Sequence, residues 1–374
     1  MTSPRLRRLQ PEHVDDLLAG VALLGSGGGG VATPFGHLAR EILSKSPVAV
    51  LRPDQLRAGA LVAPVGIVGA TALLTEKLPS GQEIIDGVDA LSRWLGRRPT
   101  AVMGIEAGGV NGIIPILAAA ALDLPLVDAD LMGRAMPRLD QFSSAVQGLP
   151  ITPCVVAQPG GEVMLLNGIK ADRVESTIRA VVSRTSGWGQ LVVAPMTPGQ
   201  VTAAAVPGSL SRAIWLGHRF RRLAREYGTP GATYPAGGAP IGAKARAFGE
   251  QLGGRGLAGG RVAARLRRPS AGEFAQSDTV LVDVSGSVLR VSAENEFLAV
   301  FKDGVMVASC PDLIVMVDNR SHALLQVEEV RVGTDVLVLT IPGPPWWLAH
   351  PQRLERVGPR AFGIDHDAVL VDAQ

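Results

Sequence analysis

Three acidic side chains follow short apolar runs in the middle of the chain. Glu106 comes just after the β-prone run at residues 100–105, and Asp128 and Asp130 come just after a second run at residues 124–127. Ligands bind at the carboxyl ends of strands in open α/β sheets, so this pattern predicts a functional site there. Asp128 and Asp130 are two residues apart, and on an extended backbone their carboxylates would share one face.

These residue types suit several kinds of chemistry. Glu106, Asp128 and Asp130 can supply a general base, hold a divalent metal ion, or cap the turns that follow them. Asn111 can both donate to and accept from an amide-like ring, and the Arg134 guanidinium can hold a substrate carboxylate with two hydrogen bonds. Arg134 can instead pair with one of the aspartates. The sequence leaves these alternatives open.

A glycine-rich segment, Gly25-Ser-Gly-Gly-Gly-Gly30, lies near the start of the chain. It fits the G-x-G-x-x-G pattern, which makes nucleotide binding one alternative. Residues 12–24 before it have helical spacing, however, and Pro34 soon follows, whereas a dinucleotide fingerprint follows a strand and opens a helix. We therefore expect a loop whose bare backbone amides approach a small ligand, formed by Gly27, Gly28, Gly29 and Gly30.

Composition narrows the class of protein. With 374 residues, of which 47% are hydrophobic and 19% charged, the chain predicts a globular protein of two domains. The net charge is only +2 and the basic residues are scattered, so no nucleic-acid partner is expected.

Two distant cysteines favour a reducing compartment, and no apolar run is long enough for a membrane span. These features predict a cytoplasmic protein with a small-molecule substrate; assembly into a homo-oligomer stays open.

The order of expected elements divides the chain. Helical and strand-like segments alternate through the first part, which predicts an α/β domain over residues 1–165. Residues 166–374 are predicted to form a β-rich domain, with a glycine- and proline-rich loop at 228–242 and many short strands after residue 259. The turn Lys302-Asp303-Gly304 between two apolar runs predicts a hairpin. The six histidines show no ligand spacing, so no metal site can be read from local pattern.

Several motifs in this order also carry a resemblance to a known family. They are the glycine loop, Glu106-Ala-Gly-Gly-Val-Asn111, Leu124-Pro-Leu-Val-Asp-Ala-Asp130, Met132-Gly-Arg-Ala-Met-Pro137, Asn295-Glu296, Pro311-Asp-Leu-Ile314 and Val357-Gly-Pro-Arg-Ala-Phe-Gly363. Together they resemble the S-methyl-thiohydantoin desulfurase-like family, from about residue 10 to residue 366. The resemblance implies an N-terminal three-layer α/β domain, a C-terminal mostly-β domain of complex topology, and removal of sulfur from a thiohydantoin ring.

The leading hypothesis is therefore a hydrolase that acts on a small cyclic amide or thioamide of the hydantoin type. Catalysis is assigned to Glu106, Asp128 and Asp130, with a divalent metal ion as an option, and substrate binding to the glycine loop, Asn111, Arg134 and Asn295. The turn around Asn295 is expected to face the N-terminal site, or else to cap a turn in its own domain. An alternative of another class is a non-catalytic subunit or regulatory partner of a hydantoin- or oxoproline-processing enzyme.

Overall fold

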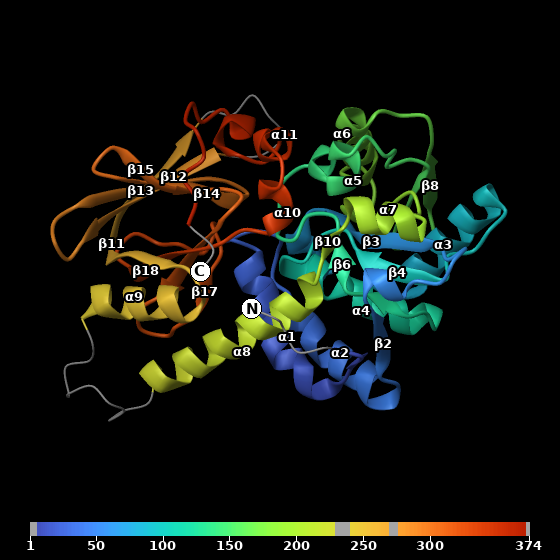
Figure 1. Cartoon of the computed structure of the whole chain (residues 1–374), viewed down its shortest axis with the longest axis horizontal. Coiled ribbons are helices and arrows are strands. Elements are labelled where there is room, and N and C mark those ends of the chain that lie inside the picture. Colours follow the sequence, from blue (N-terminus) through green and yellow to red (C-terminus); the bar gives the residue numbers. More distant parts are fainter. Residues whose placement is uncertain (1–5, 229–239, 269–275, 372–374) are drawn as a thin grey trace. The chain divides into compact units, whose positions relative to one another are not determined.

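The computed structural model describes residues 6–228, 240–268 and 276–371 (Figure 1). The chain divides into two compact units. The first unit consists of Met1–Val21 and Gly29–Trp215, and the second consists of Ala22–Gly28 and Leu216–Gln374. The short segment 22–28 thus belongs with residues far along the chain, which no local pattern in the sequence indicates.

The first unit is built on an eight-stranded mixed sheet with the order β1-β2-β5-β4-β3-β9-β7-β8. Its centre is parallel and its β9, β7 and β8 side is antiparallel. The strands are β1 (Arg8–Leu9), β2 (Val48–Leu51), β3 (Val62–Gly69), β4 (Ala101–Gly104), β5 (Leu126–Val127), β7 (Cys154–Ala157), β8 (Val163–Leu166) and β9 (Trp188–Val192). A parallel strand that is covered on both faces is a continuous apolar run in the sequence. Strand β4 (AVMG) is an example, since every one of its residues is buried.

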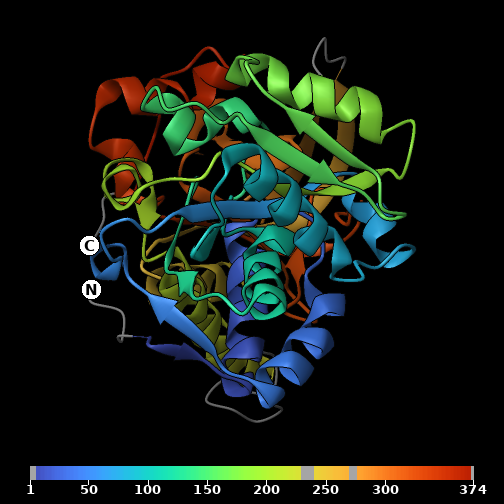
Figure 2. The ribbon, with the colours of Figure 1, turned by 90° about the vertical axis from the view of Figure 1, so that its right-hand side faces the viewer.

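Helices cover this sheet, and Figure 1 shows α4 and α6 on opposite sides of β3 and β4. Helix α4 packs against α2, α3 and β4, and its all-apolar sequence IPILAAAAL fits a position covered on several sides. Figure 2 gives a second view of this arrangement. The helices up to residue 228 are α1 (Val14–Leu24), α2 (Thr33–Lys45), α3 (Gln82–Leu95), α4 (Ile114–Leu122), α5 (Ser143–Val146), α6 (Ala171–Val182), α7 (Pro198–Ala204) and α8 (Ser209–Gly228). Helices α1 and α8 each begin in the first unit and end in the second. A two-stranded ribbon pairs β6 (Ala129–Asp130) with β10 (Val206–Pro207).

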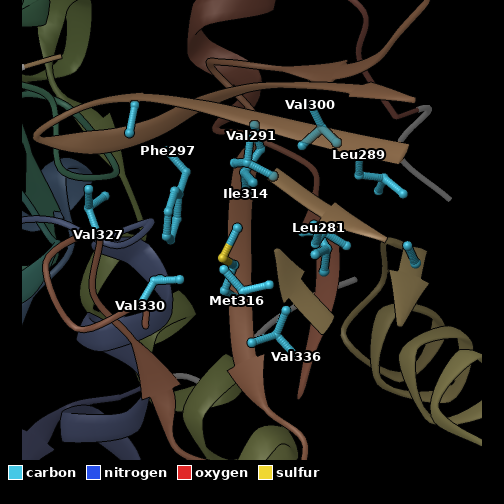
Figure 3. Packing of buried hydrophobic residues seen from close by; sticks show 14 of the residues in the cluster. Leu281, Leu289, Val291, Phe297, Val300, Ile314, Met316, Val327, Val330 and Val336 are labelled. Carbon is cyan, nitrogen blue, oxygen red and sulfur yellow. The ribbon is translucent and has the colours of Figure 1, made fainter. Parts of the chain in front are cut away.

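The second unit is an eight-stranded antiparallel sheet with the order β15-β14-β13-β12-β11-β18-β16-β17. Its strands are β11 (Arg255–Arg268), β12 (Gln276–Asp283), β13 (Val288–Glu294), β14 (Glu296–Lys302), β15 (Val305–Ser309), β16 (Leu313–Asp318), β17 (Leu324–Leu325) and β18 (Asp335–Ile341). Its helices are α9 (Ile241–Gln251), α10 (Pro345–Leu348) and α11 (Pro351–Glu355). Inward-facing side chains such as Leu281, Val291, Phe297 and Met316 form one buried cluster (Figure 3).

Segment 22–28 is held within the second unit by specific hydrogen bonds. The Ser26 hydroxyl donates to the Ile314 carbonyl over 2.9 Å and accepts from the Ile314 amide over 3.0 Å. The amide of Phe297 donates to the Ser26 carbonyl at 2.8 Å, and the amide of Val327 donates to the Gly27 carbonyl at 2.8 Å. Ser26 is completely buried, so these bonds satisfy polar groups that water does not reach.

The fold class predicted from the sequence is confirmed: an α/β unit is followed by a unit of antiparallel β structure. The hairpin at residues 302–304 joins β14 to β15, and both Asp303 and Gly304 have positive φ (49° and 85°), as a tight hairpin turn requires. The first compact unit extends beyond residue 165, because β9 pairs with β3. The domain boundary predicted between residues 165 and 166 stays a prediction.

Several helices were not predicted, and α2 and α9 are the longest of them. Helix α2 follows the glycine loop directly; Pro34, which suggested a break, lies in its first turn, where proline is tolerated. The loop expected at residues 228–242 lies mostly outside the described residues, at 229–239, and α9 begins at Ile241.

Candidate active site

Glu106 lies two residues beyond the end of β4, as the sequence predicted, and its carboxylate is buried. The Asn111 amide donates to Oε1 over 2.7 Å, and the Met136 backbone amide donates to Oε2 over 3.3 Å. Burial raises the pKa of Glu106 from 4.5 to about 7, although these two hydrogen bonds and the positive charge of Arg134 act to lower it. The carboxyl therefore titrates near neutral pH.

Asn111 holds Glu106 to the neighbouring strand. Its Oδ1 accepts from the Ile67 amide at 2.7 Å, and its Nδ2 donates to the Ile67 carbonyl at 3.2 Å as well as to Glu106. On the side of β3 next to β4, strand pairing ends at Val65 and Gly104, so the Asn111 side chain supplies the partners that β4 would otherwise give to Ile67. Both donor hydrogens of Asn111 are occupied, one of them by Glu106, and the predicted contact of Asn111 with a substrate stays a prediction.

Asp130 is the last residue of β6 and is almost completely buried. Its Oδ1 accepts from the backbone amides of Met132 (3.0 Å) and Gly133 (2.5 Å), whereas its Oδ2 has no hydrogen-bond partner among the described residues. Burial raises the pKa of Asp130 from 3.8 to about 8; the two amides oppose that rise, and the charges of Glu106 and Asp128 add to it. An unpaired carboxyl oxygen in a buried place favours the protonated form.

Glu106 and Asp130 line one small cavity of about 30 Å³ in the first unit. Its other walls are mostly apolar and include Leu17 of α1 and Pro115 of α4. Gly104 keeps the cavity open, because a Cβ there would lie 3.2 Å from Pro115 Cγ and 3.6 Å from Asp130 Cβ. The volume is enough for a water molecule between the two acidic groups.

Asp128, in contrast, caps a helix. Its Oδ1 accepts from the backbone amides of Leu210 (2.9 Å) and Ser211 (3.2 Å) at the start of α8, and its Oδ2 accepts from the Ser211 hydroxyl at 2.5 Å. The positive end of a helix stabilises such a carboxylate. Asp128 does not line the cavity, and its predicted part in catalysis stays a prediction.

Arg134 is buried beside this group of acids. Its Nε donates to the Ala135 carbonyl over 2.9 Å, and the charge of its guanidinium lowers the pKa of Glu106. The structure therefore brings four of the predicted residues together, namely Glu106, Asn111, Asp130 and Arg134. The predicted contact of Arg134 with an acidic substituent of the substrate stays a prediction.

The glycine loop makes close contacts with the chain itself. In the first unit, the Gly29 carbonyl accepts from the Val110 amide at 2.9 Å, and a Cβ on Gly109 would lie 2.1 Å from that carbonyl oxygen. In the second unit, a Cβ on Gly27 would lie 2.4 Å from the Phe297 ring, and one on Gly28 would lie 2.4 Å from Glu296 Oε1. These contacts explain why glycine is needed here; the role of the loop in ligand binding stays a prediction.

The nucleotide-binding alternative lacks its structural context. Helix α1 precedes the glycine loop, whereas a dinucleotide fingerprint follows a strand. Among residues 6–228, 240–268 and 276–371, no group of three or more His, Cys, Asp or Glu side chains is arranged to hold a metal ion. The same part of the chain has no helix of the length and apolarity needed to cross a bilayer.

Asn295 lies in the second unit, in the turn between β13 and β14. It has a positive φ of 67°, which Asn tolerates better than most residues, and its Nδ2 donates to Glu296 Oε1 over 2.8 Å. This geometry fits a turn residue, and its contact with a ligand stays a prediction.

Three contributions to the site could not be found from residue types. The Met136 amide that binds Glu106 and the Ile67 peptide groups that fix Asn111 are backbone groups, and every non-proline residue carries the same ones. The packing of Pro115 over the cavity likewise has no signal in the sequence.

Comparison with models of known protein families shows to which family the chain belongs. The family model described as "S-Me-THD-like, N-terminal domain" matches residues 12–168, and the family model described as "S-Me-THD-like, C-terminal domain" matches residues 169–371. The chain belongs to the S-Me-THD-like family. The division between the two models lies before β9, so the N-terminal family domain is shorter than the first compact unit.

This S-Me-THD-like chain also resembles a solved structure, an X-ray crystal structure of a protein from Chromobacterium violaceum. The TM-score is 0.73 at 22% sequence identity, and the match covers 96% of this chain and 98% of the other. At that identity the similarity shows a shared fold. A search of curated proteins gives no match.

Proposed function

We propose that this protein is a hydrolase that acts on a small cyclic amide or thioamide of the hydantoin type and releases sulfur from a thiohydantoin ring. The observation that carries the proposal is the pair of buried carboxyls, Glu106 and Asp130, on one cavity that has room for the attacking water, in a chain of the S-Me-THD-like family. Their pKa values of about 7 and about 8 support the roles of proton acceptor for Glu106 and proton donor for Asp130 near neutral pH.

In the proposed reaction, Glu106 accepts a proton from a water molecule as the water oxygen attacks the ring carbon that bears sulfur. Asp130, which is protonated at neutral pH, donates its proton to the sulfur as the carbon–sulfur bond breaks. With an S-methylated ring, the remaining hydroxyl proton moves to the adjacent ring nitrogen, which leaves a ring carbonyl and methanethiol. With an unsubstituted thiohydantoin, that proton becomes the second proton on sulfur, and a ring carbonyl and hydrogen sulfide result. Transfer of the proton from Glu106 to Asp130 through water restores the starting state, so one water is consumed for each sulfur released.

The surroundings of Glu106 support its role as the base. Asn111 fixes the carboxylate through Oε1, and among the residues that the structure describes Oε2 has only the long contact to Met136. The charge of Arg134 favours the ionised form that a base requires. We assign the attacking group to water and not to a cysteine, because Cys154 and Cys310 are buried and burial raises the pKa of Cys154 to about 12. Two free thiols also support a cytoplasmic location.

The test is an assay of thiol release from an S-methylated thiohydantoin by the purified protein. We expect methanethiol in a one-to-one ratio with the hydantoin product. Glu106→Gln and Asp130→Asn should each lower kcat by about 100-fold or more, the usual contribution of a general acid or base. Matched controls are Glu76→Gln and Asp123→Asn, which lie at exposed positions of the same unit and should keep full activity.

Two results would overturn the proposal. Turnover at the wild-type rate by both Glu106→Gln and Asp130→Asn would remove the acid pair from the mechanism. No release of thiol or sulfide by the unaltered protein, over a range of ring substituents and pH 6–9, would remove the substrate class.

A further inference from the structure

The first unit contains a second and much larger cavity, of about 300 Å³. It lies among helices α2, α3 and α4 and reaches Gln190 of β9, and it shares no lining residue with the cavity of Glu106 and Asp130. A buried apolar cavity of about half this size holds benzene. The second cavity is therefore large enough for a molecule of bicyclic size.

Most of the cavity wall is apolar. Leu38 and Ile42 of α2, Ile84 of α3 and Leu117 of α4 contribute aliphatic side chains, and the neighbouring alanines of α4 are too short to fill the space. The lining contains no Lys or Arg. An apolar wall without a basic residue disfavours an anionic ligand, because burying an unpaired charge is costly.

The acidic residue of the lining already has its hydrogen bonds. The Glu83 carboxylate accepts from the Ser80 amide (3.1 Å), the Ser80 hydroxyl (2.9 Å) and the Gly81 amide (3.0 Å) at the start of α3. These bonds fix the entry to the helix and stabilise the charge locally. The cavity thus favours a neutral and mostly apolar ligand.

One polar group in the lining has unused capacity. Gln190 is only 4% exposed, and its Nε2 donates to the Gly66 carbonyl at 2.7 Å. Its Oε1 accepts no hydrogen bond from any residue that the structure describes. The oxygen of a side-chain amide has two acceptor positions, and Gln190 lines the cavity. A ligand that brings one N–H or O–H would pair with it.

We propose that this cavity is a binding site for a neutral small molecule with an apolar body of bicyclic size and one hydrogen-bond donor. That donor would form a hydrogen bond to Gln190 Oε1. The site is separate from the proposed active site, and the proposal does not depend on the reaction. The two places nevertheless contact consecutive residues of β3: Gln190 binds the Gly66 carbonyl, and Asn111, which holds Glu106, binds both peptide groups of Ile67.

The test is isothermal titration calorimetry of the full chain with three related probes. Indole has the size and the N–H donor, 1-methylindole lacks only the donor, and indole-3-acetate adds a negative charge. We expect one indole to bind per chain, 1-methylindole to bind about tenfold more weakly because Gln190 stays unpaired, and indole-3-acetate to show no binding. Equal affinity for indole and 1-methylindole would overturn the assignment of Gln190. Absence of indole binding at millimolar concentration would overturn the site.

A variant that fills the cavity locates the bound probe. Ala118 is buried in the lining, and Ala118→Leu places three more carbon atoms in the space, so indole binding should be lost. If that variant does not fold, Ala121→Leu at an exposed part of the lining replaces it. Ala180→Leu, on an exposed face of α6, is the matched control and should bind indole like the unaltered chain. Unchanged binding by a folded cavity variant would place the indole elsewhere and refute the proposal.

Discussion

Replacing Asp130 with Asn is expected to stabilise the protein at alkaline pH, although the residue lies at the proposed active site. In the folded protein the pKa of Asp130 is about 8, whereas its ordinary value is 3.8. Between about pH 4 and pH 8 the carboxyl is ionised in the unfolded chain and protonated in the folded one. Unfolding then releases a proton, so the free energy of unfolding falls as the pH rises, by roughly 1.4 kcal/mol per pH unit.

The sign of the effect is the reverse of the usual one for an aspartate. Because the folded pKa is raised, the stability that the protonated group contributes is fully present below about pH 4 and is lost by about pH 8. Asn cannot ionise, so Asp130→Asn lacks this dependence. Its Oδ1 can still accept from Met132 and Gly133. Between pH 5 and pH 8 the difference in stability between variant and wild type should shift by roughly 3–4 kcal/mol in favour of the variant.

Urea unfolding at pH 5, 7 and 8 measures this shift, with tryptophan fluorescence as the signal, since Trp188 is completely buried in the first unit. The exposed Asp123→Asn is the control and should change stability equally at the three values. A stability difference for Asp130→Asn that is the same at pH 5 and pH 8 would refute the reasoning. It would mean that Asp130 ionises normally in the folded protein and cannot be the proton donor.

Three further outcomes follow from other contacts. Asn111→Ala removes a hydrogen bond that lowers the pKa of Glu106, so the acid limb of kcat/KM for thiol release should move to higher pH; an unmoved limb would exclude Glu106 as the titrating base. Asp128→Ala removes the cap of α8 and should lower the free energy of unfolding in urea by about 1–2 kcal/mol. An unchanged free energy of unfolding would contradict this prediction. Gly109→Ala places a Cβ 2.1 Å from the Gly29 carbonyl oxygen and should lower the stability of the fold by roughly 2 kcal/mol more than Gly96→Ala does. Gly96 is the control because it has a similar φ and open space around it. Equal shifts of the melting temperature in the two variants would count against the close backbone packing.

Part of the fold follows from local pattern alone. The apolar runs around β4 and β5 and the apolar helix between them predicted the α/β character of the first unit, and with it the position of Glu106 at a strand end. The hairpin at Asp303 and Gly304 was equally clear, because few residues accept the left-handed conformation that such a turn needs. Local signals of this kind depend on side chains a few residues apart, which a sequence displays directly.

The chemical roles of the acidic residues depend on distant parts of the chain. Asp128 and Asp130 look equivalent in sequence, yet the start of α8, 82 residues after Asp128, supplies the amide that turns Asp128 into a helix cap. Asp130 keeps an unpaired oxygen on a buried cavity and so gains a raised pKa. Burial is a property of the packed unit and not of the residue, so no spacing rule could separate the two.

For the glycine loop, too, the sequence determined one part and the tertiary structure the other. Its composition by itself determined that the backbone approaches something closely and uses positive φ, as Gly27, Gly29 and Gly30 do. Only the tertiary structure decided what is approached: residues 22–28 join the second unit through Ser26 and Phe297, and Gly29 packs on Gly109 in the first. Glycine permits a close contact without specifying its partner, because a residue without a side chain carries no information about what it meets.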